Sequence, residues 1–372
     1  MDSRKGSPGR SRTSAERIDE PRDRGGPPIS APATIVEGSL DGSGWENYAA
    51  THPDATLFHQ PAWLQVIQET FGHRSISLVA RRGDRTVGFL PLFLVPTLPW
   101  GKAAISAPLG VYGGAIANDT AIEQELLARA AEIAAERGAR YLELRNQRRL
   151  EGLPTRDLYV TFRRPIYPDA EQNMAAIPRN QRRSIRVAQK HGLTARVGRE
   201  ELLEGFYRVY SESMRNLGTP VFPRTLFQRL LTRLGENCVI LGVYREDTLL
   251  SAVLTFTYRD QVMPYYGGAI REGIQYATND FMYWSLLCHA MERGLKVFDF
   301  GRSKRGSGSF DFKRHWGFEP TPLAYQYRLI RQKSLPDLSP KNPKFSLAIR
   351  VWQRLPLRLT QWVGPRLVRY FP

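Results

Sequence analysis

The chain has 372 residues, of which 42% are apolar and 11% aromatic, enough for the cores of two or three ordinary domains. Its net charge of +17 favours a polyanionic partner such as nucleic acid, a phosphorylated substrate or an acidic membrane surface. The longest apolar stretch, 87–100, contains three prolines and is shorter than the ~20 residues of a spanning helix. We therefore expect no transmembrane segment.

Residues 1–34 are rich in Arg, Ser, Pro and Gly and offer little to bury, so we predict a disordered basic N-terminal tail. This segment has no apolar stretch of the kind that a signal peptide contains. The two cysteines, Cys238 and Cys288, lack a CxxC spacing and lie in apolar segments. We expect them to be reduced core residues of a cytoplasmic protein.

The elements expected in chain order are helix 62–71, strands 77–82 and 86–94, helix 121–137, strand 141–144, helices 177–192, 202–216 and 225–234, strands 239–245 and 248–258, helix 281–293 and strand 297–300. Gly138 and Gly294 directly follow two of these helices, where a C-capping glycine is favoured. Helix, hairpin, Gly-rich strand, helix and strand occur in this order twice.

The second half of the chain also repeats the first in sequence. Tyr-Gly-Gly-Ala-Ile stands at 112–116 and again 154 residues later at 266–270. Solenoid units run to only ~20–50 residues, so this period indicates whole domains. We predict one domain at 35–166 and a second at 167–330, followed by a basic amphipathic C-terminal tail at 331–372.

The excess of basic residues is concentrated at 178–191, 302–314 and 331–372, and we expect anionic groups to bind there. Within the last segment, 345–370 combines Arg with Trp and Leu. That pattern fits an interfacial membrane helix or, equally, a helix packed on the protein body.

Two motifs in the second half resemble the FemAB family of tandem GNAT-fold transferases. The strand 298–301, Phe-Asp-Phe-Gly, is similar to the family's "YDFxG" strand, and Phe-Lys-Arg-His-Trp at 312–316 is similar to its "FKxxF" signature. The basic segment 180–186 resembles the start of the family's second domain. The resemblance covers about 36–330 and implies an α/β (α+β) fold of two GNAT-like domains, each a mixed, mostly antiparallel sheet flanked by helices.

The blocks 57–64, 215–223, 279–284 and 299–306 resemble FemAB-like proteins associated with PEP-CTERM/exosortase and exopolysaccharide gene clusters. The resemblance implies an N-acyl or aminoacyl transferase that acts on a cell-envelope, peptidoglycan-type or exopolysaccharide precursor. We expect it in the cytoplasm, and the amphipathic stretch 345–370 adds the expectation of peripheral contact at the inner face of the membrane. Such an enzyme belongs to cell wall biogenesis. The alternatives are an acyl-CoA-dependent GNAT acetyltransferase of a sugar amine and a non-catalytic polyanion-binding module.

Acyl transfer to an amine passes through a tetrahedral oxyanion, which a positive group stabilises. The resemblance places Lys313 in that role, although a solvated surface lysine is the alternative. Asp299 ends an apolar strand, where it acts as a base, orients Arg302 or Lys304, or forms a structural salt bridge. The predicted substrate-binding residues are Arg182, Arg186, Tyr266, Arg302, Ser303, Lys304 and Trp316. We identify no metal-ligand spacing and expect no tightly bound cofactor.

Acetyl-CoA-dependent GNAT enzymes bind pyrophosphate through a Q/RxxGxG/A turn, and neither Ile116 nor Ile270 is followed by one. FemAB enzymes that use aminoacyl-tRNA also lack it, so we rank aminoacyl-tRNA above acyl-CoA as the donor. The expected anionic partners are tRNA, CoA or a lipid-linked glycan, and not DNA. The small-residue loop 306–309 is a further candidate for contact with phosphate.

Overall fold

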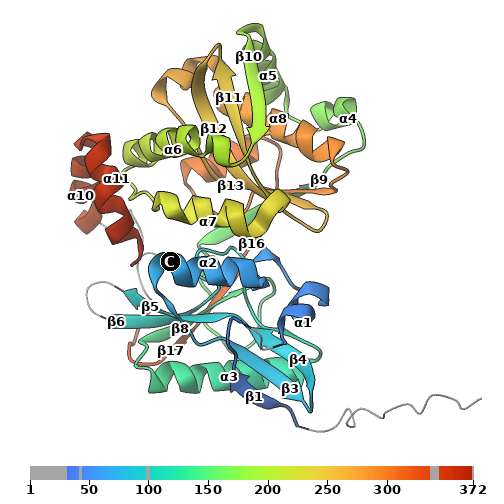
Figure 1. Cartoon of the computed structure of the whole chain (residues 1–372), viewed down its shortest axis with the longest axis vertical. Helices are drawn as coiled ribbons and strands as arrows, with labels where there is room; N and C mark the ends of the chain where they lie inside the picture. The colour runs from blue at the N-terminus through green and yellow to red at the C-terminus, as the bar shows by residue number, and fades with distance from the viewer. Residues whose placement is uncertain (1–31, 42–43, 98–100, 336–342, 371–372) are drawn as a thin grey trace, which may run out of the picture. The chain divides into compact units, whose positions relative to one another are not determined.

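The computed structural model describes residues 32–41, 44–97, 101–335 and 343–370. The described residues from Ala33 onward form one compact unit (Figure 1). Most of the predicted N-terminal tail lies outside the described residues, and its last residue, Thr34, begins strand β1 (Thr34–Glu37). The domain boundaries at 166 and 330 therefore remain a prediction about one continuous body.

The first half contains two small sheets joined at Pro91. One has the order β1, β3 (Leu78–Arg82), β4 (Arg85–Leu90), β7 (Ile116–Ala117), and the other β17 (Ala324–Leu329), β8 (Tyr141–Asn146), β6 (Gly101–Ser106), β5 (Leu92–Thr97), β2 (Arg74–Ser75). The predicted strand 86–94 becomes β4 and β5 because proline cannot donate to a strand ladder. Helix α3 (Thr120–Glu136) packs on these strands, and the Asp119 side chain caps it by accepting from the N–H of Ile122.

Short helices complete the first half: α1 (Glu46–Thr51), the 3-10 helix η1 (Leu57–His59) and α2 (Pro61–Phe71). Helix α2 starts with a proline at its first position, where the missing N–H costs no hydrogen bond, and ends at Gly72 in the left-handed conformation. It packs against α7 (Arg224–Leu234) of the second half. The two halves therefore share a hydrophobic core, in which Trp63 meets Phe256 edge to face at 5.8 Å.

The second half is one larger sheet with helices on both faces. Its order is β10 (Leu193–Gly198), β11 (Cys238–Arg245), β12 (Thr248–Tyr258), β13 (Gln261–Ala269), β14 (Val297–Asp299), β9 (Tyr159–Pro165), β15 (Ser303–Lys304), with β16 (Pro320–Pro322) also on β9. Helices α6 (Leu203–Leu217) and α7 cover one face, and α5 (Arg179–Lys190) and α8 (Thr278–Glu292) the other. The remaining helices are α4 (Ala170–Ala175), η2 (Glu200–Leu202), η3 (Gly235–Asn237), η4 (Arg271–Tyr276) and α9 (Gly308–His315).

The duplication predicted from sequence is visible in the strand pairing. In the first half β6 pairs with β8 in parallel, at Ala104↔Leu142, and in the second half β13 pairs with β14 in parallel, at Val262↔Phe298. Most other pairs are antiparallel. The predicted mixed, mostly antiparallel sheets flanked by helices are therefore confirmed.

Each half donates its last strand to the sheet of the other half. Strand β9 follows the first half along the chain but lies between β14 and β15 of the second sheet. Strand β17 follows the second half but forms the edge of a first-half sheet on β8. Periodicity indicates that a segment is a strand but does not identify its partner, so the sequence did not predict this exchange.

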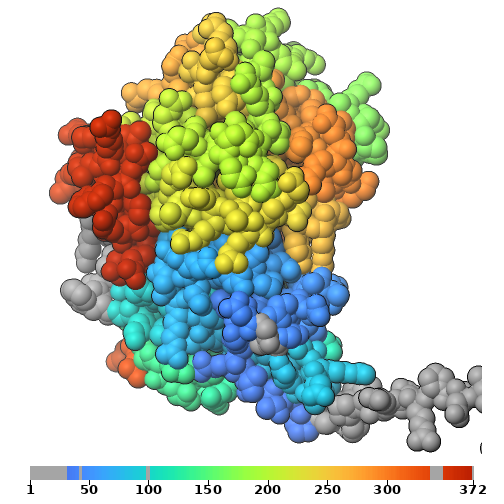
Figure 2. Space-filling model, in the orientation of Figure 1, coloured from blue at the N-terminus to red at the C-terminus, as the bar shows by residue number. Residues whose placement is uncertain are grey.

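The predicted helical stretch 345–370 is two helices, α10 (Pro343–Arg354) and α11 (Leu357–Val368), separated at Pro356. Both pack on α6, and Figure 2 shows them at the surface of the molecule. Within the described residues, every helix is too short or too polar to cross a membrane.

Because β9 lies within the second sheet, we predict that a substitution of a buried β9 residue destabilises that sheet. Phe162 of β9 is fully buried there, so Phe162→Ala should lower the free energy of unfolding by about 3–5 kcal/mol in urea titration. Tyr167, two residues after β9, is 37% exposed and serves as the control. Tyr167→Ala should cost less than about 1 kcal/mol, and equal losses in the two variants would contradict the exchange.

Candidate functional site

A pocket opens where strands β13 and β14 separate. They pair in parallel at Gln261↔Val297 and Val262↔Phe298, and beyond these positions they diverge. The space between them is a cavity of about 360 Å³, which we call the Lys313 pocket. Its lining includes Tyr265, Tyr266, Gly301, Arg302, Ser309 and Lys313.

Helix α9 carries Lys313 into this pocket. The helix begins after Ser307, whose hydroxyl accepts from the N–H of Phe310, so the predicted phosphate loop 306–309 is a helix cap. Lys313 is buried, and its ammonium donates to the carbonyls of Phe300 (2.7 Å), Gly301 (3.1 Å) and Arg302 (3.3 Å). Burial lowers the pKa of Lys313 to about 7, partly opposed by the nearby Asp299. Lys313 is therefore not a solvated surface lysine.

The Asp299 carboxylate is completely buried and receives four contacts. Tyr112 Oη donates to it at 2.8 Å, the N–H of Gly301 at 2.8 Å and Thr161 Oγ1 at 3.3 Å, and Arg163 Nε forms an ion pair at 3.4 Å. Burial raises the pKa of Asp299, and Arg163 acts in the opposite direction. The predicted orientation of Arg302 or Lys304 by Asp299 is replaced by a contact with Arg163, which the exchanged strand β9 brings in.

Arg302 lies between aromatic rings from both exchanged strands. Its guanidinium is 4.7 Å from the ring centre of Tyr159 on β9 and 5.6 Å from that of Tyr325 on β17, and it donates to Tyr325 Oη at 3.3 Å. This stacking holds a fixed positive charge at the wall of the Lys313 pocket.

Tyr266 is enclosed by rings, including Phe222 at 5.5 Å and Phe227 at 5.2 Å. Its buried hydroxyl has no hydrogen-bond partner among the described residues, although the residue lines the pocket. Ser303 is also buried, and its hydroxyl likewise has no partner in the described part of the chain. An unpaired buried hydroxyl is costly, which makes Tyr266 a candidate for contact with a bound molecule.

The structure does not bring the remaining predicted residues to this pocket. Trp316 is buried, and its indole N–H donates to Asp280 at 2.8 Å, so it is a core residue rather than an open binding surface. Arg182 and Arg186 lie on α5, outside the described lining of the pocket. Lys304 lies on the two-residue strand β15, beside β9.

A loop of the first half forms part of the pocket wall through Leu109 and Val111. Tyr265 Oη donates to the carbonyl of Leu109, and Tyr325 Oη donates to that of Val111 at 2.8 Å. The buried Arg145 donates to the carbonyl of Gly110 at 2.9 Å and so holds the loop from behind. The pocket is therefore built by both halves.

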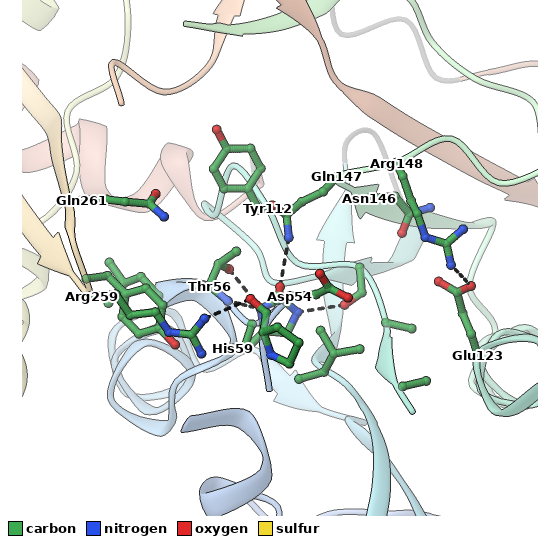
Figure 3. Close-up of a pocket in the computed structure, with 18 of the residues that line it drawn as sticks. Asp54, Thr56, His59, Tyr112, Glu123, Asn146, Gln147, Arg148, Arg259 and Gln261 are labelled. Carbon is green, nitrogen blue, oxygen red and sulfur yellow. Dashed lines mark hydrogen bonds and ion pairs between the residues drawn. The ribbon is translucent and has the colours of Figure 1, made fainter. Parts of the chain in front are cut away.

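A second cavity, of about 560 Å³, lies where the loops after β6 and β8 meet the second half (Figure 3). We call it the Tyr112 cavity. Tyr112 and Arg163 line it and also contact Asp299, which directly precedes Phe300 and Gly301 in the lining of the Lys313 pocket. Arg148 and Arg259 lie on opposite sides of the cavity in Figure 3, bound to Glu123 and to the carbonyl of Pro53 respectively.

Sequence reasoning did not identify Tyr112 or Arg163 as site residues. A signal for Tyr112 was available, because it occupies the same place in the repeated Tyr-Gly-Gly-Ala-Ile motif as Tyr266. Arg163 offered none, since its role depends on the partner of β9. Within the described ranges, no group of three or more His, Cys, Asp or Glu side chains is arranged to hold a metal ion.

Comparison with known proteins identifies the fold. Residues 178–314 match the family described as the acetyltransferase (GNAT) domain. The solved structure of FemX aligns with 80% of this chain and 98% of its own, at a TM-score of 0.62 and 15% identity. A tandem GNAT protein from the clavulanic acid biosynthesis pathway aligns with 81% of this chain and 100% of its own (TM-score 0.51, 14% identity).

This chain has a tandem GNAT fold. The C-terminal domain of a protein described as a lysylphosphatidylglycerol synthetase, from Agrobacterium fabrum, is also similar, over 71% of this chain and 86% of its own (TM-score 0.51, 13% identity). No curated protein sequence matches the chain. The predicted fold class is confirmed, and the GNAT match supports an acyltransferase.

The comparisons leave two predictions without support. A GNAT acetyltransferase domain favours acyl-CoA as the donor class, so the preference for aminoacyl-tRNA over acyl-CoA receives no support from this match. The proposed association with PEP-CTERM and exopolysaccharide gene clusters is not shown by any of these similarities.

His59 lines the Tyr112 cavity and gives a pH test of the site. The N–H of Thr56 donates to Nδ1, which places the proton on Nε2, 2.9 Å from the carbonyl of Gly114. Burial lowers the pKa of His59 from 6.5 to about 4, so between these values the unfolded chain binds more protons. His59 therefore leaves the free energy of unfolding undiminished above pH 6.5. As the pH falls from 6.5 to 4, His59 should lower this free energy by about 3 kcal/mol.

Urea titrations at several pH values would measure this decrease. His59→Gln should make the decrease smaller without abolishing it, because burial also lowers the pKa of His73 to about 4. The same change at the exposed His315 should leave the decrease intact. An unchanged pH dependence in His59→Gln would show that His59 is not held neutral.

Proposed function

We propose that this protein is an N-acyltransferase with its reaction centre in the Lys313 pocket. The tandem GNAT fold supports an acyltransferase, and the pocket lies where β13 and β14 separate. The observation that carries the proposal is the buried Lys313 ammonium beside the fully buried Asp299 and the half-buried Arg302. Buried charges without a task are rare because removing them from water is costly.

In the proposed reaction an amine of the acceptor attacks the carbonyl carbon of the donor, and a C–N bond forms. The oxyanion then collapses and expels the donor's thiolate or alkoxide, and the proton that the amine loses passes to this leaving group. Lys313 stabilises the oxyanion. Its three N–H groups are held by three carbonyls in the structure, and the longest of these bonds, 3.3 Å to Arg302, is the one expected to be exchanged for the oxyanion.

We assign the acceptor to the Tyr112 cavity. Its wall carries Arg163, whose side chain is 39% exposed even though Nε contacts Asp299. That exposed guanidinium can bind an anionic group of a cell-envelope or exopolysaccharide precursor. Arg182 and Arg186 remain candidates for contact with a large anionic donor outside the pocket, on the face of α5.

Two classes of donor fit the proposed reaction, and the GNAT domain match favours acyl-CoA. Aminoacyl-tRNA is the second candidate, on the evidence of the chain that leads into α8. In this segment the N–H of Gly273 donates to the carbonyl of Ile270, and the N–H of Ala277 donates to that of Ile274. The first turn of α8 carries Asp280. An acidic first turn disfavours a pyrophosphate at that helix end.

The name of the Agrobacterium fabrum protein, lysylphosphatidylglycerol synthetase, denotes an enzyme with an aminoacylated lipid as its product. Its structural similarity, together with that of FemX, makes aminoacyl transfer in the cell envelope the more specific form of the second candidate. The setting among exopolysaccharide and PEP-CTERM genes stays a prediction from sequence blocks alone.

Binding of acetyl-CoA and of mixed aminoacyl-tRNA at near-physiological salt separates the candidates, since salt suppresses nonspecific attraction of polyanions. Saturable binding of acetyl-CoA supports the first donor. Preference for charged over uncharged tRNA supports the second. Binding of neither, with retention of other polyanions, would favour the non-catalytic binding module.

Substitution of Lys313 tests the enzyme itself. Lys313→Met should lower kcat roughly 10²–10³-fold with donor binding retained, because it removes charge at the oxyanion. Lys296, an exposed lysine just before β14, provides the matched control, and Lys296→Met should turn over like the parent. Melting temperatures recorded alongside would separate lost catalysis from lost folding. Full turnover in a folded Lys313→Met would refute the assignment.

The pH profile of kcat/KM provides a separate test of the Lys313 charge. Since the pKa of Lys313 lies at about 7, its ammonium becomes neutral as the pH rises through that value. The rate should therefore fall on the alkaline side with a midpoint near 7. A rise through the same range would instead assign Lys313 as a base that accepts the proton of the amine.

A further inference from the structure

The two C-terminal helices have one face fixed to the protein. The side chain of Gln353 on α10 donates to the carbonyl of Asn216 at 3.0 Å. On α11, Thr360, Gly364 and Val368 are buried, and they recur every four residues, as one face of a helix does. An added Cβ at Gly364 would lie 2.9 Å from the backbone nitrogen of Val221, so this contact is close. The pair is therefore anchored beside α6.

The opposite face of each helix presents large apolar side chains to solvent. Leu347 and Val351, four residues apart on α10, are 65% and 52% exposed, and on α11 Leu359 and Trp362 are 39% and 61% exposed. Four of the ten exposed large apolar residues in the described chain thus lie on these two short helices. Such a concentration marks an interaction surface, because soluble proteins rarely expose contiguous apolar patches.

Arginines surround these apolar residues on both helices. Arg350 and Arg354 lie on α10, and Arg358, Arg366 and Arg369 lie on or directly after α11, all exposed. The guanidinium of Arg366 stacks over the Trp362 ring at 4.3 Å. The sequence from 343 to 370 contains no Asp or Glu, so the two helices contribute positive charge and no acid of their own.

We propose that the exposed face of α10 and α11 docks the protein on an anionic phospholipid bilayer. At 12 residues each, the helices are too short to span it and would lie in the plane of the interface. Leu and Trp side chains enter the boundary between headgroups and acyl chains, and arginines remain among the anionic headgroups. A nucleic acid would satisfy the arginines but leave the apolar residues in water.

This surface is separate from the Lys313 pocket and the Tyr112 cavity, and the inference goes beyond the proposed acyl transfer. Figure 2 shows the two helices on the outside of the molecule beside α6. Docking through them would hold the protein at a membrane whichever donor it uses. A failure of this proposal therefore leaves the proposed function standing, and the reverse also holds.

The test is co-sedimentation of the full chain with vesicles of phosphatidylcholine alone and of an equimolar mixture with phosphatidylglycerol. We expect binding to the mixed vesicles only, weakened by added salt. The double variant Leu359→Ser/Trp362→Ser should bind at least about tenfold more weakly, because each change removes apolar burial. Both side chains are exposed, so the variant should melt like the parent.

Ile274, 70% exposed on η4, supplies the matched control, and Ile274→Ser should bind like the parent. Arg358→Gln/Arg366→Gln should reduce binding to the mixed vesicles, whereas Arg85→Gln, at an exposed position of β4, should not. Equal binding to both vesicle types, or full binding by the Leu359/Trp362 variant, would overturn the proposal. So would binding to RNA that depends on the same arginines while vesicle binding is absent.

Discussion

The buried carboxylate of Asp299 is the constraint on which the central architecture depends. A charge in the interior costs several kcal/mol unless hydrogen bonds and a counter-ion surround it. The groups that do so come from three separate places: Tyr112 from a first-half loop, Thr161 and Arg163 from the exchanged strand β9, and the N–H of Gly301. Satisfying one side chain therefore requires both halves to be assembled in register.

The same local arrangement orders the proposed reaction centre. Gly301 adopts a positive φ of 64°, which is readily accessible to glycine, and the chain turns there directly after β14. The carbonyls of 300–302 then converge on the Lys313 ammonium. Arg302 is clamped between Tyr159 and Tyr325, one from each exchanged strand. Strand exchange thus positions Arg302 as well as Arg163, the counter-ion of Asp299.

The duplicated halves differ in the partner of one acidic residue, which lies on β8 in the first half and on β14 in the second. Glu143 stands 156 residues before Asp299 and pairs with Arg145, two positions along its own strand. In the second half the position that matches Arg145 is Gly301, so Asp299 has no such local partner and takes Arg163 from β9. Each acid faces an exchanged strand, because Glu143 lies opposite Tyr327 of β17 and Asp299 opposite Arg163 of β9. Asp299 takes its counter-ion from that strand, whereas Glu143 takes it from its own.

The sequence by itself determined the repeat, most helices and strands, and the candidate pair Lys313 and Asp299, because periodicity, caps and motifs are local properties. It could not reveal that β9 and β17 exchange sheets, since a strand pattern specifies which side chains face inward and not which strand lies beside it. The role of Arg163 followed only from that pairing, and the burial of Trp316 only from its packing in the core. The tertiary structure decided them because buried charges and rings take the partners that packing provides.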